Sequence, residues 1–312
     1  MRESDFISFE NLNKKFGKHT VINNLDLNIP FEGVFGIMGL SGCGKTTLLN
    51  MLIGFWHPDK GRVLYNAIDI HRNKQIISQL FGFATQDGSV YPKLTVEENL
   101  HYFGKLYNMR GSDIEKRMDE ILDFVDLKDS RNEIAGELST GMYRRLDIAC
   151  SMIHNPKVLL LDEPTGNLDP VLRKKLMALI KKISDEGTKV IITSHLLGEV
   201  EHICDTLAIL HNGNIVEMGS PEELKDKYTT DQVIRFETKK KDYTKIIATL
   251  KRSGVKKIFQ KDKDIYLYTK DADRILSQIL NFVLVNKDEV INVEVSKPSI
   301  EEVFEAVTRW VF

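Results

Sequence analysis

Short, uninterrupted runs of apolar residues recur along the first two thirds of the chain. They lie at residues 34–38, 81–84, 158–161 and 190–193. Each run is rich in Val, Ile, Leu or Phe and is followed by polar residues, as is typical of parallel strands buried on both faces. Helical patterns at residues 115–125, 144–154 and 171–185 alternate with the runs. The alternation predicts an α/β core with a mainly parallel sheet.

Alternating apolar and polar positions predict further strands of another kind. Residues 6–12 and 21–29 have this pattern, and we expect them to be antiparallel edge strands. Two more strands, at residues 206–211 and 214–219, flank Asn212-Gly213, which is the strongest short signal for a β-hairpin.

The pattern changes near residue 225 and predicts two domains. We place a first domain at residues 1–225, a linker at residues 226–231 and a second domain, expected to serve assembly or regulation, at residues 232–312. The second domain has the order strand, helix, strand, strand, helix, strand, which predicts a small α+β, ferredoxin-like sandwich. These elements are expected at residues 233–237, 243–252, 255–260, 265–269, 272–285 and 290–295.

A final helix is predicted after Ser299, with Glu302 completing a capping box. Its apolar residues form one stripe, which either packs back on the second domain or contacts the same domain of a second copy. The stripe consists of Val303, Phe304 and Val307, extended by Trp310, Val311 and Phe312.

Composition limits the classes of protein that fit. The 312 residues carry 43 basic and 45 acidic side chains, and this near balance gives no support for nucleic-acid binding. Three cysteines favour a reducing compartment over a disulfide framework. The first nine residues lack the apolar core of a secretory signal, and no stretch approaches the length of a membrane span. If the protein acts at a membrane, we expect another chain to cross it.

Residues 39–46 match the phosphate-loop pattern G-x-x-x-x-G-K-[ST] between a predicted strand and a predicted helix. Such glycines let backbone N–H groups surround phosphate oxygens, and the following helix adds its positive N-terminal end. Lys45 would contact the β- and γ-phosphates, and the Thr46 hydroxyl would reach Mg²⁺. The alternative is a glycine-rich turn that merely joins strand to helix. Cys43 is either a reactive thiol or, more simply, a small side chain between glycines.

Polar residues also follow the other three apolar runs. Asp162 is expected to hold Mg²⁺ and Glu163 to orient and polarise the attacking water. Gln86 could bind both Mg²⁺ and water, and His195 could donate to a γ-phosphate oxygen. Each alone could be an ordinary loop residue or a solvated strand end. Together they reach one edge of one sheet, which favours a single site.

Ser139 and Gly141 begin a predicted helix. Ser139 is a good N-cap residue, and an exposed helix start is also an anion site. The spacing leaves both interpretations open.

Together these residues closely resemble the ATPases of ABC transporters over residues 1 to about 225. The motifs occur in the family's order: the phosphate loop, Gln86 of the Q-loop, a signature segment at 138–142, the Walker B strand ending in Asp162, then Glu163, the D-loop 167–169 and the switch residue His195. The resemblance implies a P-loop fold with a mixed sheet and a helical insertion near residues 95–155. The loop residues implied to bind ATP are Gly39, Ser41, Gly42, Cys43, Gly44, Lys45, Thr46 and Thr47.

The resemblance also implies a head-to-tail dimer of cassettes around two ATP molecules. Ser139 and Gly141 would then touch the γ-phosphate that the partner's loop holds, and Asp169 would belong to the D-loop. Asp169 precedes Pro170, so it is also a plain helix N-cap. Phe16 sits where the family stacks an aromatic ring on adenine, although the sequence alone favours a strand-end core residue. The signature departs from Leu-Ser-Gly-Gly-Gln at Thr140 and Met142.

The function expected from the sequence is MgATP hydrolysis coupled to transport, with Mg²⁺ held by Thr46, Gln86 and Asp162. The partners expected are an integral-membrane permease and a second cassette, at the cytoplasmic face of the membrane. Residues 297–304 resemble the tails of ATPases that serve drug and polysaccharide exporters. The alternative function is that of a non-transport ABC ATPase in DNA repair or at the ribosome. Those ATPases usually carry a coiled coil or a second cassette, and this chain shows neither pattern.

Overall fold

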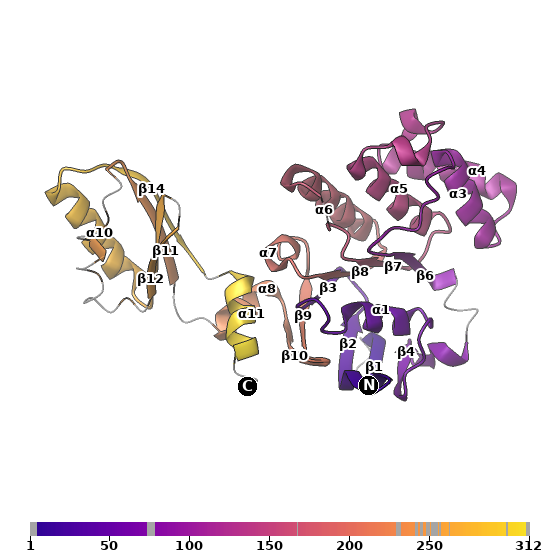
Figure 1. The fold of residues 1–312 in the computed structure, drawn as a ribbon, viewed down its shortest axis with the longest axis horizontal. Coiled ribbons are helices and arrows are strands. Elements are labelled where there is room, and N and C mark those ends of the chain that lie inside the picture. The colour runs from indigo at the N-terminus through magenta and orange to yellow at the C-terminus, as the bar shows by residue number, and fades with distance from the viewer. Residues whose placement is uncertain are drawn as a thin grey trace. The chain divides into compact units, whose positions relative to one another are not determined.

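A computed structural model describes most of the chain. The described residues are 5–73, 79–166, 168–228, 232–240, 243, 246–247, 250, 255, 257–261, 263–297 and 299–309. The chain forms two compact units, Met1–Pro221 and Glu222–Phe312, and Figure 1 shows the elements of each.

The first unit contains a six-stranded sheet with the order β10-β9-β3-β8-β7-β6. Its strands are β3 (Val34–Met38), β6 (Phe81–Ala84), β7 (Val158–Asp162), β8 (Lys189–Ser194), β9 (Thr206–His211) and β10 (Asn214–Gly219). All neighbours are parallel except β10, which pairs antiparallel with β9. Every predicted apolar run is one of these strands, and β3, β7 and β8 are buried along their whole length. The predicted hairpin is confirmed: Asn212 and Gly213 have φ of 48° and 76°, as a two-residue turn requires.

The strands expected at residues 6–12 and 21–29 are antiparallel, but they are not edges of the parallel sheet. They are β1 (Asp5–Phe16) and β2 (His19–Pro30), and they form a separate sheet with the order β2-β1-β4-β5. Its other strands are β4 (Lys60–Tyr65) and β5 (Ile68–Asp69). The reason lies in their alternation: their apolar face packs on a helix rather than continuing the parallel sheet.

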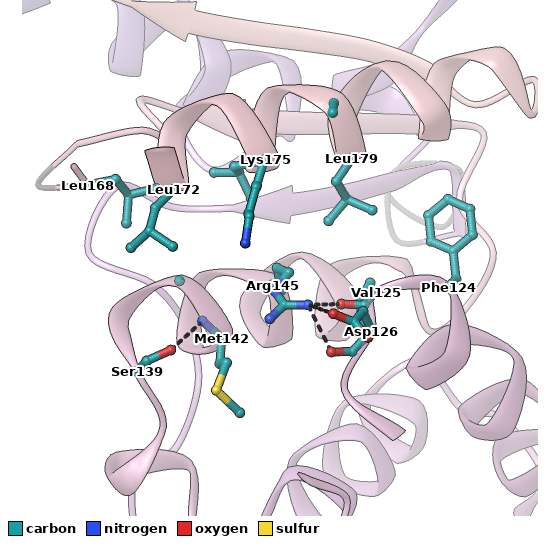
Figure 2. Close-up of a pocket in the computed structure, with 13 residues that line it drawn as sticks. Phe124, Val125, Asp126, Ser139, Met142, Arg145, Leu168, Leu172, Lys175 and Leu179 are labelled. Atoms are coloured by element: carbon teal, nitrogen blue, oxygen red, sulfur yellow. Dashed lines mark hydrogen bonds and ion pairs between the residues drawn. The ribbon is translucent and has the colours of Figure 1, made fainter. Parts of the chain in front are cut away.

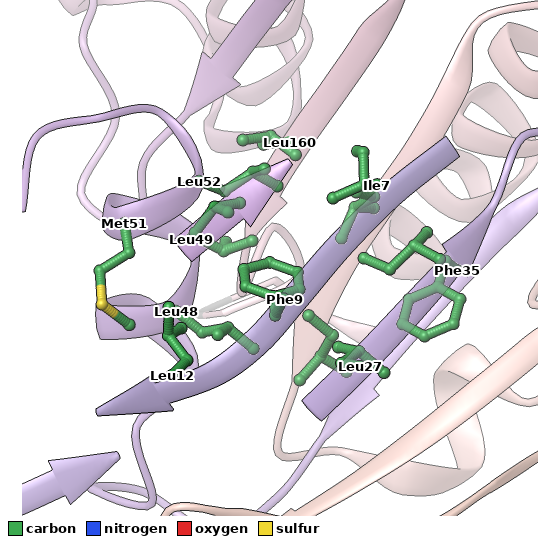
Figure 3. Close-up of a cluster of buried hydrophobic side chains, with 14 of the residues drawn as sticks. Ile7, Phe9, Leu12, Leu27, Phe35, Leu48, Leu49, Met51, Leu52 and Leu160 are labelled. Carbon is green, nitrogen blue, oxygen red and sulfur yellow. The ribbon is translucent and has the colours of Figure 1, made fainter. Parts of the chain in front are cut away.

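That helix is α1 (Lys45–Leu52), which lies between the two sheets. Figure 3 shows Phe9 of β1 and Phe35 of β3 in the same buried cluster as Leu48, Leu49 and Leu52 of α1. The phosphate-loop segment runs from β3 to α1. Because residues of both elements pack in this cluster, the cluster fixes the two ends of that segment.

Helices α5 (Thr140–Met152) and α6 (Pro170–Asp185) cover the opposite face of the parallel sheet (Figure 1). With α3 (Val96–Leu106) and α4 (Gly111–Phe124), α5 makes up the helical insertion expected near residues 95–155. Shorter helical segments are α7 (Leu197–Val200), η1 (Ile70–Arg72), η2 (Lys128–Ser130) and η3 (Ala135–Glu137).

The second unit contains a four-stranded antiparallel sheet with the order β12-β13-β11-β14. Its strands are β11 (Gln232–Thr238), β12 (Lys257–Lys261), β13 (Asp264–Thr269) and β14 (Val290–Ser296), and α10 (Ala272–Val285) connects the last two. This is the predicted ferredoxin-like order. The helix expected at 243–252 lies partly outside the described residues, but Ile246 and Leu250 are buried in the unit's own core with α10.

The segment expected to be a linker, residues 226–231, begins inside a helix. Helix α8 runs from Pro221 to Tyr228, and residues 229–231 lie outside the described part of the chain. Proline suits a first helical position, and the acids in the first turn and lysines in the last turn complement the helix dipole. These local signals override the polar composition that suggested a linker.

The final helix, α11 (Ile300–Arg309), buries its apolar stripe within the chain. Val303, Phe304 and Val307 are at most 5% exposed. These three side chains are therefore covered within the chain, whereas their packing on the core of the second domain stays a prediction. Trp310, Val311 and Phe312 lie outside the described residues.

His154, just after α5, is partly buried between the helical insertion and the sheet. Its ring stacks on Tyr107 with centroids 3.5 Å apart, and its Nε2 donates to the carbonyl of Phe81 at 3.2 Å. Burial lowers the pKa of His154 to about 4, outweighing the opposing effect of the Phe81 hydrogen bond. The folded protein therefore holds this imidazole neutral.

Stability should depend on the charge of His154 between about pH 6.5, its unfolded pKa, and pH 4. The unfolded chain binds the proton more readily than the folded chain does. The free energy of unfolding therefore falls as the pH drops below 6.5, by up to about 3 kcal/mol from this group. Urea unfolding at pH 7.5 and 5 should show a smaller pH effect for His154→Gln than for the unmodified chain. His202→Gln, at an exposed position, is the control. Equal pH effects in all three chains would contradict the assignment.

Candidate functional site

Residues that follow four parallel strands meet at one edge of the six-stranded sheet. The loop 39–44 follows β3, Gln86 comes after β6, Glu163 follows β7 and His195 follows β8. A cleft of about 460 Å³ lies here. It is lined by Phe16, His19, Val21, Ser41, Gly42, Gly44, Lys45, Thr46, Thr47, Gln86 and Glu163. The carboxyl edge of a parallel sheet is where α/β proteins bind their ligands.

The loop between β3 and α1 depends on glycine. Gly42 and Gly44 have φ of 82° and 113°, which L side chains rarely adopt. A Cβ on Gly39 would lie 2.4 Å from the carbonyl oxygen of Leu210, so no side chain fits there. Helix α1 begins directly at Lys45 with no side-chain cap on its first N–H groups. A tight glycine loop leading into an uncapped helix start fits a phosphate group.

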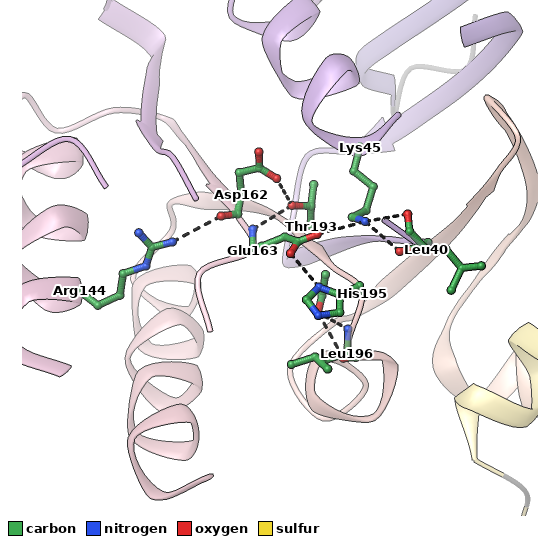
Figure 4. A network of polar contacts seen from close by, with 10 residues as sticks. Leu40, Lys45, Arg144, Asp162, Glu163, Thr193, His195 and Leu196 are labelled. Carbon is green, nitrogen blue, oxygen red and sulfur yellow. Dashed lines mark hydrogen bonds and ion pairs between the residues drawn. The ribbon is translucent and has the colours of Figure 1, made fainter. Parts of the chain in front are cut away.

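Lys45 is the central cation of the cleft. Its ammonium donates to the carbonyls of Gly39 and Leu40 at 2.8 and 3.2 Å and lies 3.1 Å from Oε1 of Glu163. The other carboxylate oxygen of Glu163 is 2.7 Å from Nδ1 of His195. Figure 4 shows these three side chains in one continuous chain of polar contacts. Lys45 is 4% exposed, so its charge is held in a largely water-excluded position.

Glu163 is held in an unusual backbone conformation. Its φ is 47°, uncommon for a residue other than glycine and costly unless its surroundings enforce it. The hydroxyl of Thr193 accepts the Glu163 N–H at 3.0 Å and donates to Oδ1 of Asp162 at 2.5 Å. Thr193 therefore fixes both acids at the end of β7. The sequence interpretation missed this role, although Thr193 is the polar end of an otherwise aliphatic run.

A buried arginine supports the same strand end from α5. Arg144 donates to the carbonyls of Pro164 at 2.9 Å and Thr85 at 2.8 Å, and forms an ion pair with Asp147 at 2.9 Å. Burial raises the pKa of Asp147, opposed by the Ser89 N–H and by Arg144. No local pattern reveals this network, because its members come from three segments that only the fold brings together.

The structure places the remaining predicted residues in the cleft, in the phosphate loop or at the start of a helix. Phe16 lines the cleft and is 40% exposed, so it is not a core residue. Cys43 lies in the loop, and burial raises its thiol pKa against the opposing effect of Lys45, which does not favour a reactive thiolate. Asp169 caps α6 through the N–H groups of Val171 and Leu172. Asn167 of the D-loop lies outside the described residues.

Ser139 and Gly141 do not line this cleft. The Ser139 hydroxyl accepts the Met142 N–H at 3.3 Å and so caps α5. Both residues line a different cavity of about 360 Å³ between α5 and α6, where Leu168 and Leu172 also lie (Figure 2). Within one chain, the structure therefore does not bring the signature segment to the phosphate loop.

The side chains proposed for Mg²⁺ fit a hard cation. Thr46 and Gln86, which carry a hydroxyl and an amide oxygen, line the cleft, and Asp162 lies at the end of β7. In the described part of the chain, no cluster of three or more His, Cys, Asp or Glu residues could hold a metal by itself. Mg²⁺ is usually bound by one or two protein oxygens together with substrate phosphates.

Comparison with known proteins identifies the family. A family model described as ABC transporter matches residues 22–166, and one described as the C-terminal domain of DrrA1-3-like ATP-binding proteins matches residues 219–308. The Nod factor export ATP-binding protein I of Ralstonia nicotianae is 35% identical over 218 residues, covering 70% of this chain and 68% of that protein. The chain belongs to the ABC transporter ATP-binding proteins.

Two further similarities extend over the cassette and the whole chain. The linearmycin resistance ATP-binding protein LnrL of Bacillus subtilis is 27% identical over 297 residues, covering 95% of this chain and 96% of that protein. The solved structure of cbiO1 from Clostridium perfringens matches 72% of this chain and 92% of its own, with 26% identity and a TM-score of 0.67. As a member of this family, the chain is an ATPase that serves a transporter. None of the helices described here is long and apolar enough to cross a membrane.

Replacing Thr193 should test how the two acids of this ABC cassette are held. Thr193→Val keeps the shape but leaves the buried Asp162 carboxylate and Glu163 N–H without their shared partner, which should lower the free energy of unfolding by about 1–3 kcal/mol. Thr193→Ser keeps the hydroxyl and is the matched control. Urea denaturation compares the three chains, and a Val variant as stable as the Ser variant would contradict the bridging role.

Proposed function

We propose that this chain is the MgATP-hydrolysing subunit of a membrane exporter, and that it works as a head-to-tail sandwich of two cassettes. The observation that carries the hydrolytic part is the Lys45–Glu163–His195 chain of contacts beside a glycine phosphate loop. It joins a cation, a carboxylate and an imidazole by direct contacts at the edge of the cleft, which suits attack of water on a terminal phosphate.

Lys45 would exchange one anionic partner for another when ATP binds. Its ammonium, now shared with Glu163, would contact the β- and γ-phosphates, while the loop N–H groups and the start of α1 bind phosphate oxygens. Phosphate binding at Lys45 would release the Glu163 carboxylate from its ion pair. Glu163 would then be free to accept a hydrogen bond from the attacking water.

His195 would orient Glu163 and donate a hydrogen bond to the γ-phosphate, and Gln86 would bind the water from the side of β6. Mg²⁺, held by Thr46, Gln86 and Asp162, would neutralise charge that develops on the phosphate oxygens. The Thr193 bridge keeps Asp162 and Glu163 in fixed positions during this process. Pre-positioned charges of this kind reduce the reorganisation that the reaction requires.

A second cassette would complete the site. Ser139 and Gly141 lie outside the cleft of their own chain, at the start of α5, where Ser139 is exposed and Gly141 is buried. In a head-to-tail dimer, each signature segment would meet the γ-phosphate bound by the partner, and Asp169 would lie near the interface. Closing on ATP and opening after hydrolysis would supply the movement that drives transport.

The proposed partner is an integral-membrane permease at the cytoplasmic face of the membrane. Two similar proteins are named for drug resistance and for Nod factor export, which favours export as the direction. The loop 86–94 connects the cleft to α3 and is the proposed contact with the permease. In this loop the exposed Tyr91 side chain meets the exposed Tyr102 of α3 edge to face, with ring centroids 4.8 Å apart.

Removing the central cation should abolish hydrolysis. Lys45→Ala loses the charge that faces the β- and γ-phosphates, so phosphate release from MgATP should fall by at least about 100-fold. The matched control is Lys116→Ala on the exposed face of α4, with unchanged turnover. Equal turnover in the two variants would overturn the site assignment.

Removing the carboxylate should separate binding from hydrolysis. Glu163→Gln keeps the shape and loses the group that polarises water, so it should bind MgATP and turn it over very slowly. Light scattering after size exclusion should show a dimer of this variant with MgATP and a monomer with MgADP. A monomer with both nucleotides would contradict the sandwich.

A further inference from the structure

Phe16 at the rim of the cleft is supported by an aromatic ring from another segment. It ends β1 at a hairpin tip, where Phe16 pairs with His19 and Gly17 has φ of 60°. Its ring meets Trp56 edge to face, with centroids 5.2 Å apart and planes at 81°. Trp56 is not among the described residues that line the cleft. Trp56 therefore contacts Phe16 from outside the cleft.

The end of α1 directs Trp56 to this place. Gly54 has φ of 74°. Its N–H donates to the backbone carbonyl of Met51 at 3.1 Å, and the N–H of Phe55 donates to the backbone carbonyl of Asn50 at 2.9 Å. This pair of bonds is a Schellman motif, which ends a helix and turns the chain sharply. The same helix begins at the phosphate loop, so α1 connects the loop at one end with the support of Phe16 at the other.

Lys14 fixes the segment that carries Trp56. Its ammonium donates to the carbonyl of His57 at 2.7 Å, lies 3.3 Å from Asp59, and is 5.4 and 5.7 Å from the ring centroids of Phe16 and Trp56. Asp59 also accepts the N–H of Lys15 at 2.7 Å. The lysine thus holds both rings while its stem is largely covered.

We propose that Trp56 is a positioning residue for the nucleotide base: it holds the Phe16 ring at the rim of the cleft so that a base can stack on it. The proposal rests on the proposed function, because it requires nucleotide in this cleft. A ring at a hairpin tip is free to rotate, and stacking would have to restrict it. Contact with Trp56 restricts rotation of the Phe16 ring before the base binds, and such preorganisation increases the affinity for the nucleotide. Because every base has an aromatic face, the effect should distinguish ligands with a base from those without.

Titration calorimetry of the full chain with MgADP and with Mg-pyrophosphate tests this, since neither ligand undergoes the proposed hydrolysis. Trp56→Ala should weaken MgADP about 3- to 10-fold, the scale of an edge-to-face aromatic pair, and leave pyrophosphate unchanged. Trp56→Phe should stay within about twofold of the unmodified chain. Phe31→Ala, which removes another exposed aromatic ring in edge contact, is the matched control and should change neither affinity.

The outcomes separate this proposal from the proposed function. If the unmodified chain binds neither ligand, the phosphate cleft itself is wrongly assigned. If it binds both and Trp56→Ala weakens them equally, Trp56 supports the fold rather than the base, and the proposal is overturned; an unchanged MgADP affinity overturns it as well. In a Trp310→Phe chain, Trp56 is the sole tryptophan, and its emission should change with MgADP but not with pyrophosphate.

Discussion

The buried ammonium of Lys45 is the constraint on which the site depends. A cation removed from water needs close oxygen partners, and Lys45 finds two carbonyls in its own loop and a carboxylate in Glu163. The loop follows β3 and Glu163 follows β7, with β8 between them in the sheet. The ion pair therefore requires that these three strands lie parallel and in register. Their continuous burial between α1 on one face and α5 and α6 on the other is what keeps them so.

Polar contacts extend this constraint from the sheet edge into the helical insertion. Thr193 on β8, the middle strand, joins Asp162 to the backbone of Glu163. Arg144 then joins the segments after β6 and β7 to α5 through Thr85 and Pro164. Helix α5 begins at the signature segment, capped by Ser139. One helix thus connects the strand ends at the cleft of its own chain with the surface that we propose to meet the partner's nucleotide.

The sequence predicted what depends on local pattern. The buried runs gave the parallel strands, Asn212-Gly213 gave the hairpin, and the phosphate-loop and strand-end residues meet as expected. The prediction from sequence failed where contacts between distant segments determine the structure. Strands β1 and β2 form their own sheet because α1 separates them from the parallel one. Thr193 and Arg144 act through partners far along the chain. The strand pattern alone favours a core position for Phe16, and only the family resemblance indicates the adenine site. At a hairpin tip the ring is 40% exposed and contacts a tryptophan forty residues later.

The signature segment shows why local and functional roles must be separated in this chain. A Cβ on Gly141 would lie 2.9 Å from Cδ2 of Leu172, so a larger residue there would have to displace this side chain where α5 packs against α6. The Ser139 hydroxyl caps α5 within its own chain. Changes at either residue would disturb α5 and, through Arg144, the strand ends that carry Asp162 and Glu163. The departures lie elsewhere: Thr140 is exposed in the first turn, and Met142 contributes its backbone N–H to the cap. Both keep the helix start intact, so they can alter contact with a partner without altering the cleft. In the proposed sandwich, changes at these two positions would therefore act on the contact between cassettes, while the cleft of each chain keeps its own contacts.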